Sequence, residues 1–259
     1  MLRAEASVND RAIVARVAAA KPDFILSIDN MQVFGKELLA TPVRGSVNFH
    51  NGLIERYRGV NIPSWAIFNG EAEHGVSWHY MNRSVDTGDV VAARRFMLTG
   101  KETALSLTLE CIRVGIELFA EHLQSLLAGN RTRVDVAGAR VYRHRDLPND
   151  GYLDLRWSSA QIDRMLRATD FRPFPNPFCY ARIRFPAGEL IVNEAQPMAH
   201  TGTPVPGEIV AADDKLVLAC GDAALDITAV MLSPEEEATV KNAVAALGLA
   251  AGQRAIRAS

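Results

Sequence analysis

The sequence predicts an α/β fold in which a mainly parallel sheet is followed by a small β-barrel. The first half alternates helix-like and strand-like segments, which is the pattern of a parallel sheet with helices packed against it. The last third contains short apolar runs separated by turn signals, which is typical of a small barrel. We therefore expect an α/β domain over 1–128, a connector over 129–153, the barrel over 154–231, and a terminal helix and tail over 232–259.

Capping residues and apolar spacing divide the first half into elements. Asn9 or Asp10 can cap a helix that ends at Lys21, because Pro22 cannot continue it. A buried strand of the parallel type follows over 24–28, so helix and strand form half of a βαβ unit. By the same reasoning we expect further strands at 46–49, 75–80 and 90–93, and further helices at 61–68 and 103–127.

The second half begins with a connector that is rich in Arg, Asp and Gly. Ser158 or Ser159 then caps a helix, and the closely spaced prolines of 172–178 exclude regular structure there. Ser233 and Pro234 are expected to start the final helix, and the tail from Gly248 is expected to fray. The barrel strands are predicted at 179–185, 189–193, 207–211, 215–220 and 225–231.

Composition limits the classes of function. The 259 residues are 48% hydrophobic and 22% charged, as in an ordinary globular protein. A net charge of −2 provides no overall attraction for nucleic acid. Cys111, Cys179 and Cys220 are too few and too far apart for a disulfide framework or a zinc site. No apolar stretch reaches membrane-spanning length and no leader is visible, so we expect a cytoplasmic protein without membrane contact.

Three polar residues form the candidate site. Asn48 and His50 are two residues apart on a strand, so they point to one face, and Asp86 lies on a glycine-containing loop that can reach back to them. Each taken alone is an ordinary hydrogen-bonded or turn residue, but their joint spacing favours catalysis. An amide can stabilise an oxyanion, an imidazole can carry a proton, and a carboxylate can accept one. Because no Ser or Cys nucleophile is placed nearby, the set indicates direct acyl transfer.

These residues carry a resemblance to a known family. The Asn48-x-His50 pair, the LIERYRG that follows, Gly75, and the run Val85 to Asp89 resemble the formyltransferases that use 10-formyltetrahydrofolate. The resemblance is strong over 22–128 and weaker to about 231. It implies a Rossmann-like catalytic domain that lacks its first strands here, with Asn48, His50 and Asp86 as the catalytic trio. It also implies folate contacts from four residues, namely Met31, Val33, Arg83 and Val85, and no metal.

The chain departs from the family pattern at several points. The family usually has proline where this chain has Glu55, and often serine where it has Gly52. The family also begins with a strand, a glycine turn and a second strand, and nothing similar precedes Val8. Two further histidines fall outside the motif: we interpret His74 as a turn residue and His79 as pocket lining at most.

The resemblance implies a mechanism but leaves the acceptor open. A primary amine would attack the formyl carbon, Asn48 and His50 would bind the oxyanion, and Asp86 would take the amine proton and keep His50 charged. We expect the amine of an amino-acid-like or carrier-bound biosynthetic intermediate as the acceptor, with methionyl-tRNA as the less favoured alternative. From other classes, a formyltetrahydrofolate hydrolase or an inactive folate-binding module remains open.

Overall fold

The computed structural model describes residues 7–198 and 205–256, which form two compact units. Unit 1 comprises Met1–Pro63, Ala72–Leu98 and Leu107–Arg143. Unit 2 comprises Ser64–Glu71, Thr99–Ser106 and His144–Ser259. The candidate trio lies entirely within unit 1. The domain boundaries expected from the sequence at 128 and 153 stay a prediction.

Unit 1 is built on a four-stranded sheet of order β1-β2-β4-β5. Only β1 and β2 are parallel, because β4 pairs antiparallel with both β2 and β5. The expectation of a mainly parallel sheet is therefore wrong for these strands. The loop between β4 and β5 is too short for the crossover that a parallel pair requires. The strands are β1 (Phe24–Ser27), β2 (Gly45–His50), β4 (Glu73–Tyr80) and β5 (Val90–Met97).

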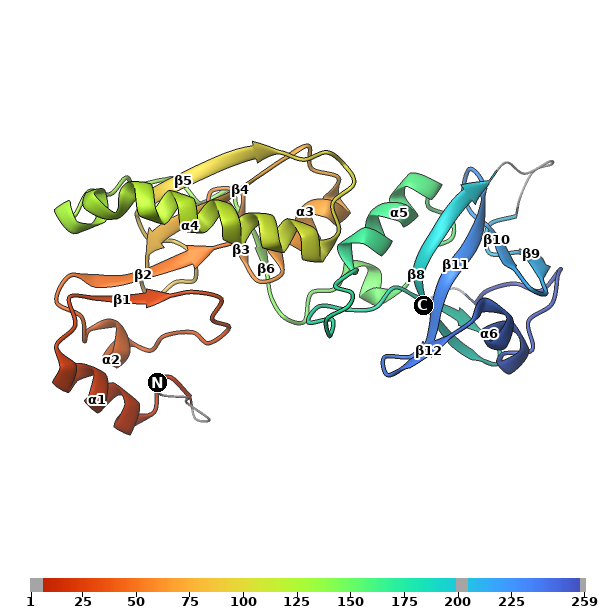
Figure 1. Cartoon of the computed structure of the whole chain (residues 1–259), viewed down its shortest axis with the longest axis horizontal. Helices are drawn as coiled ribbons and strands as arrows, with labels where there is room; N and C mark the ends of the chain where they lie inside the picture. Colours follow the sequence, from red (N-terminus) through yellow and green to blue (C-terminus); the bar gives the residue numbers. More distant parts are fainter. Residues whose placement is uncertain (1–6, 199–204, 257–259) are drawn as a thin grey trace. The chain divides into compact units, whose positions relative to one another are not determined.

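One helix precedes β1 and another follows it (Figure 1). Helix α1 (Arg11–Ala20) is capped as predicted, since the Asp10 carboxylate accepts a hydrogen bond from the Ala12 N–H, and it ends before Pro22. It buries none of its residues completely. The short helix α2 (Lys36–Leu39) connects β1 to β2 and contacts α1.

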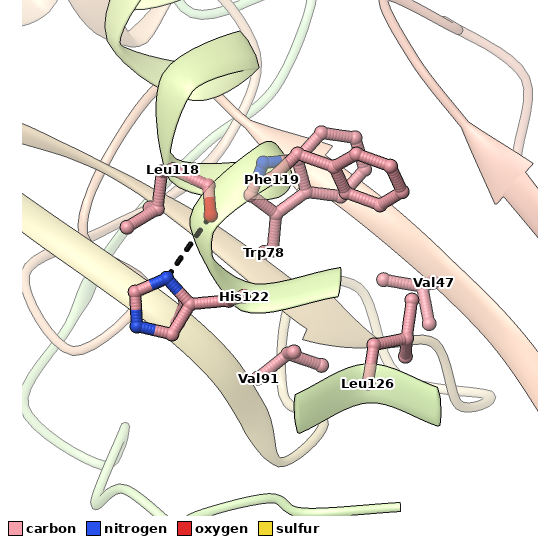
Figure 2. Close-up of a pocket in the computed structure, with 8 residues that line it drawn as sticks. Val47, Trp78, Val91, Leu118, Phe119, His122 and Leu126 are labelled. Atoms are coloured by element: carbon pink, nitrogen blue, oxygen red, sulfur yellow. Dashed lines mark hydrogen bonds between the residues drawn. The ribbon is translucent and has the colours of Figure 1, made fainter. Parts of the chain in front are cut away.

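One face of the sheet packs against the long helix α4 (Ala104–Ala128), whose residues from Leu107 onward belong to unit 1. The Trp78 indole N–H donates to the carbonyl of Gly115 over 2.9 Å, and its ring lies 4.7 Å from that of Phe119. A Cβ at Gly115 would lie 2.2 Å from the Phe49 ring, so glycine lets the helix approach the sheet closely. Figure 2 shows the apolar interior below this helix, where a void of only about 10 Å³ remains.

The connector expected over 129–153 is more ordered than its composition indicated. Strand β6 (Arg140–Tyr142) pairs in parallel with β3 (Tyr57–Gly59), and a 3-10 turn, η1, covers Pro148–Gly151. Gly59 has φ +96°, and a Cβ there would lie 1.9 Å from the Tyr142 carbonyl oxygen. Backbone pairing between distant segments, which no local pattern reveals, is the reason for this difference.

Unit 2 combines helical segments with a separate antiparallel sheet. Helix α5 (Ser159–Ala168) begins with a capping box in which Ser158 and Gln161 exchange hydrogen bonds, as the predicted cap requires. Helix α3 (Ile62–Asn69) contributes its residues from Ser64 onward. The sheet has the order β7-β8-β11-β10-β9 with β12 on β11. Its strands are β7 (Arg182–Phe185), β8 (Gly188–Met198), β9 (Ile209–Ala212), β10 (Leu216–Ala219), β11 (Ala224–Ser233) and β12 (Glu236–Ala238).

This second sheet curls into a half-barrel (Figure 1). Hydrogen bonds from the chain's last described residues connect its two edges. The Ala255 N–H donates to the Gly207 carbonyl beside β9, and the Ile256 N–H donates to the Arg184 carbonyl of β7. The predicted fraying from Gly248 is therefore wrong up to Ile256, because both edges provide hydrogen-bond partners. The final helix also begins later than expected: Ser233 ends β11, and α6 (Val240–Ala246) starts after its cap at Thr239.

Candidate active site

The polar face of β2 carries the candidate site. Val47 and Phe49 point toward α4, so Asn48 and His50 point to the opposite face. The antiparallel register sets Asn48 against His79 of β4, which places that histidine on the same face. The Nε2 atom of His79 lies 3.4 Å from the Asn48 amide nitrogen. Both histidines are buried, with His50 5% and His79 2% exposed.

The loop between β4 and β5 brings Asp86 to these residues. Asp86 has a left-handed backbone with φ 49°, a conformation that Asp tolerates better than most residues. Its Oδ2 lies 3.6 Å from Nδ1 of His50 and accepts a 2.7 Å hydrogen bond from the Gly59 N–H. Its Oδ1 lies 3.4 Å from Nε2 of His79. The loop is held in place by Arg58, whose guanidinium donates twice to the Val85 carbonyl over 3.0 and 2.6 Å.

The hydrogen bonds of His50 define its role. Its Nε2 lies 3.0 Å from the Tyr57 carbonyl oxygen and must donate to it, because a carbonyl can only accept. Burial lowers the pKa of His50 below its usual 6.5, although the charge of Asp86 acts in the opposite direction. The imidazole is therefore neutral at pH 7, and the expectation of a charged His50 is wrong. Its Nδ1, which faces Asp86, is the atom that can receive a proton.

Asp86 is ionised although it is mostly buried. Burial raises the pKa of its carboxyl, but the positive charge that His50 carries at low pH and the hydrogen bonds from His79 and the Gly59 N–H together outweigh burial, and the net pKa lies well below the usual 3.8. The ionised carboxylate can accept a hydrogen bond from an attacking amine, and the neutral imidazole beside it is the more basic group, which can hold the amine's proton.

His79, which the sequence indicated as pocket lining at most, contacts both Asn48 and Asp86. Its Nδ1 hydrogen bonds to the Tyr80 carbonyl oxygen over 2.9 Å, and its Nε2 faces both Asn48 and Asp86. It thereby links the amide to the carboxylate. The signal was the register between β2 and β4, which the sequence does not display. His74 was also misplaced: it lies inside β4, 3% exposed, and its Nε2 lies 3.0 Å from the Asn51 carbonyl oxygen.

The four residues expected to bind folate fall on two loops. Arg83 and Val85 share the loop of Asp86, whereas Met31 and Val33 follow β1, whose last residue pairs with Asn48. All four side chains are exposed, Met31 by 52% and Val33 by 63%. Their role in binding folate stays a prediction.

The three cysteines are free and buried. Burial raises the pKa of all three cysteines, that of Cys179 to about 12, so none of them forms a thiolate at neutral pH. Within 7–198 and 205–256, no three side chains of the His, Cys, Asp or Glu type are grouped as metal ligands. None of the helices in those ranges combines the length and apolarity that crossing a bilayer requires.

Comparison with known proteins identifies the family. Residues 2–123 match the formyl transferase family, and residues 147–247 match the formyl transferase C-terminal domain. The chain belongs to the formyl transferase family. Over 154 residues it is 37% identical to the GDP-perosamine N-formyltransferase of Brucella melitensis biotype 1, a match that covers 60% of this chain and 59% of that protein. The chain thus spans less than two thirds of the length of this relative.

Two solved structures share the fold. HypX from Aquifex aeolicus, in complex with tetrahydrofolic acid, superposes with a TM-score of 0.68 at 20% identity, over 91% of this chain and 41% of HypX. The N-formyltransferase from Helicobacter canadensis, in complex with folinic acid and dTDP-3-aminofucose, gives a TM-score of 0.59 at 16% identity, over 83% of this chain and 73% of that one. Both matches extend over the two units described above.

Proposed function

We propose that this protein transfers a formyl group from 10-formyltetrahydrofolate to the primary amine of a nucleotide-linked amino sugar. The observation that carries the proposal is the mostly buried, ionised Asp86 carboxylate, which lies next to His50 Nδ1 and His79 Nε2. These two histidines share their face of the sheet with Asn48. Membership of the formyl transferase family supports formyl as the transferred group. The name of the Brucella relative and the ligands of the Helicobacter structure support a sugar nucleotide as the acceptor.

The proposed mechanism uses the protonation states of the site. The folate supplies a formyl group on N10 that an amine can attack. The Asn48 amide donates a hydrogen bond to the formyl oxygen as it gains negative charge. Asp86 accepts the proton that the amine loses as the new C–N bond forms, and neutral His50 can take up this proton at Nδ1, where Asp86 stabilises the resulting charge. The proton then passes to N10 as the C–N10 bond breaks.

The acceptor differs from the one that the sequence favoured. We expected an amino-acid-like or carrier-bound amine, and the relatives named above instead carry sugar nucleotides in their descriptions. None of them supports methionyl-tRNA, and the net charge of −2 provides no attraction for it. We therefore replace the earlier acceptor with an amino sugar.

One assay separates the remaining functions. The protein is incubated with 10-formyltetrahydrofolate and, in parallel, GDP-perosamine, dTDP-3-aminofucose, amino acids or methionyl-tRNA, and formylated product and free formate are both measured. We expect product with an amino sugar nucleotide. Formate release without product would indicate a hydrolase, and tight folate binding without turnover would indicate a binding module; either result would contradict the proposal.

The Asn48→Ala variant tests the site within the same assay. Loss of one oxyanion donor lowers kcat by about 10²–10³-fold in other enzymes, and we expect a similar loss here. Asn130→Ala, an exposed amide outside the site, is the matched control and should keep the wild-type rate. Full activity of Asn48→Ala would contradict the assignment of the oxyanion donor.

A further inference from the structure

Unit 1 contains a large hollow that the mechanism above does not use. Its volume is about 1100 Å³, which is ample for a nucleotide. The wall is formed by the start of β2, the end of β4, part of the Asp86 loop and the segment 131–137. Asn82, Thr87 and Gly88 contribute from the Asp86 loop, so the hollow adjoins the loop that carries the catalytic carboxylate.

Two arginines of segment 131–137 line the hollow. Between them, Thr132 exchanges both of its backbone hydrogen bonds with Val90, each 2.8 Å long. This pairing holds the segment extended, so Arg131 and Arg133, two residues apart, project to the same side. The Arg131 guanidinium also lies over the Tyr80 ring, 5.2 Å from its centre, which limits its freedom.

The charges around the hollow favour an anion. Three arginines and two aspartates line the hollow, so positive charge is in excess. They are Arg44, Arg131, Arg133, Asp89 and Asp135. Asp89 lies 3.9 Å from Arg131, and both are more than 40% exposed, so this ion pair stabilises little and can be exchanged for a ligand.

The remaining charged residues of the hollow differ in the contacts that they already make. Asp135 already accepts a hydrogen bond from the Ala137 N–H. Arg44 donates to the carbonyl of Leu127 and lies over the Phe24 ring. Among the described residues, Arg133 makes no ion pair with a carboxylate, so its guanidinium is available to a ligand.

A buried hydroxyl on the same wall lacks a partner. Ser46 is 2% exposed and lines the hollow, and its Oγ makes no hydrogen bond to any described residue. The Oγ of Ser46 is shielded from solvent, so the two arginines, and not this hydroxyl, are the donors that can reach the oxygens of a phosphate group in the hollow.

We propose that this hollow binds the diphosphate of the nucleotide-linked acceptor through Arg131 and Arg133. The inference rests on the proposed function and adds to it the place where the acceptor is recognised. Diphosphate binding replaces the weak contact between Arg131 and Asp89. It places the sugar of the acceptor along the Asp86 loop, from where its amine approaches the carboxylate.

Binding without the formyl donor tests this directly. The Kd values of GDP, UDP and inorganic pyrophosphate are measured by equilibrium dialysis for the full chain and for Arg131→Gln/Arg133→Gln. We expect the double variant to bind at least about tenfold more weakly, because two charge-assisted contacts are lost. The matched control is Arg11→Gln/Arg16→Gln, which removes the same charge from exposed positions on α1 and should keep the wild-type Kd.

The outcomes separate this proposal from the proposed function. Unchanged circular dichroism and Tm establish that the double variant folds, and the single Arg133→Gln variant provides a milder change if it does not. The proposed diphosphate site is contradicted if the wild-type protein binds none of the three probes at millimolar concentration. It is also contradicted if the double variant binds them with the wild-type Kd.

Kinetics provide the second readout. If formyl transfer occurs, the double variant should raise KM for the sugar nucleotide about tenfold or more and leave kcat and the folate KM unchanged. Formyl transfer with an unchanged KM in the double variant would contradict the proposed diphosphate site and support the proposed function. Arginine-dependent GDP binding without any formyl transfer would support the site and contradict the function.

Discussion

The two faces of the β2–β4 pair are both largely buried but serve different purposes. The face toward α4 presents Phe49 and Trp78, which pack against Gly115 and Phe119 of the helix. The opposite face presents Asn48, His50 and His79, which contact one another or Asp86. Strand alternation thus separates packing from chemistry within a few residues.

The comparison also shows what burial does to each face. On the apolar face, burial contributes stability directly through removal of apolar surface from water. On the polar face, burial lowers the pKa of His50, and the Oγ atoms of Ser46 and Ser77 have no hydrogen-bond partners among the described residues. Burial of polar groups on such a face lowers the free energy of unfolding, and the same groups are suited to a functional site. Substitutions on the two faces should therefore have separable effects.

The largest effect is expected on the polar face, from Asp86→Asn. Asparagine keeps the size of the side chain and removes the charge that accepts the amine proton, so formyl transfer should fall by about 10²–10⁴-fold. The measurement is kcat with an amino sugar nucleotide. Asp146→Asn on the connector is the control. A loss of less than tenfold would show that another group accepts the proton.

A change on the apolar face should affect stability and spare the chemistry. Alanine at Gly115 would place its Cβ 2.2 Å from the Phe49 ring, and overpacking of this kind lowers the free energy of unfolding by about 1–3 kcal/mol. Urea denaturation measures the change. Gly138→Ala is the matched control, because a Cβ there meets no atom within 4 Å. If Gly115→Ala abolished kcat in folded protein, the two faces would not be independent.

The smallest effect is the pH dependence that arises from His50. Its pKa is lower in the folded protein than the usual 6.5, so the unfolded chain binds more protons between these values. The contribution of His50 to the free energy of unfolding should therefore be fully present above pH 6.5 and should decrease as the pH falls below 6.5. Chemical denaturation from pH 7.5 to pH 5 measures this decrease, which the His50→Gln variant should reduce. The exposed His144→Gln variant is the control; an equal slope in His50→Gln would contradict the role of burial.

Much of the fold followed from local patterns. Asp10 and Ser158 cap helices where their side chains predict caps, and Pro22 ends α1. The strand pairing did not follow: β4 lies antiparallel to β2, and β6 reaches back to β3 across about 80 residues of chain. Pairing direction depends on connection length and on partners distant in the sequence, so a single strand's residues do not reveal it.

For the candidate site, the sequence by itself determined that Asn48 and His50 share a face and that Asp86 lies on a loop able to turn back, because alternation and turn chemistry are local properties. Only the tertiary structure decided that His79 joins them, since this depends on the register of β4 against β2. It also decided that His50 is neutral and Asp86 ionised, because protonation depends on burial and on neighbouring charges, which exist only once the chain has folded.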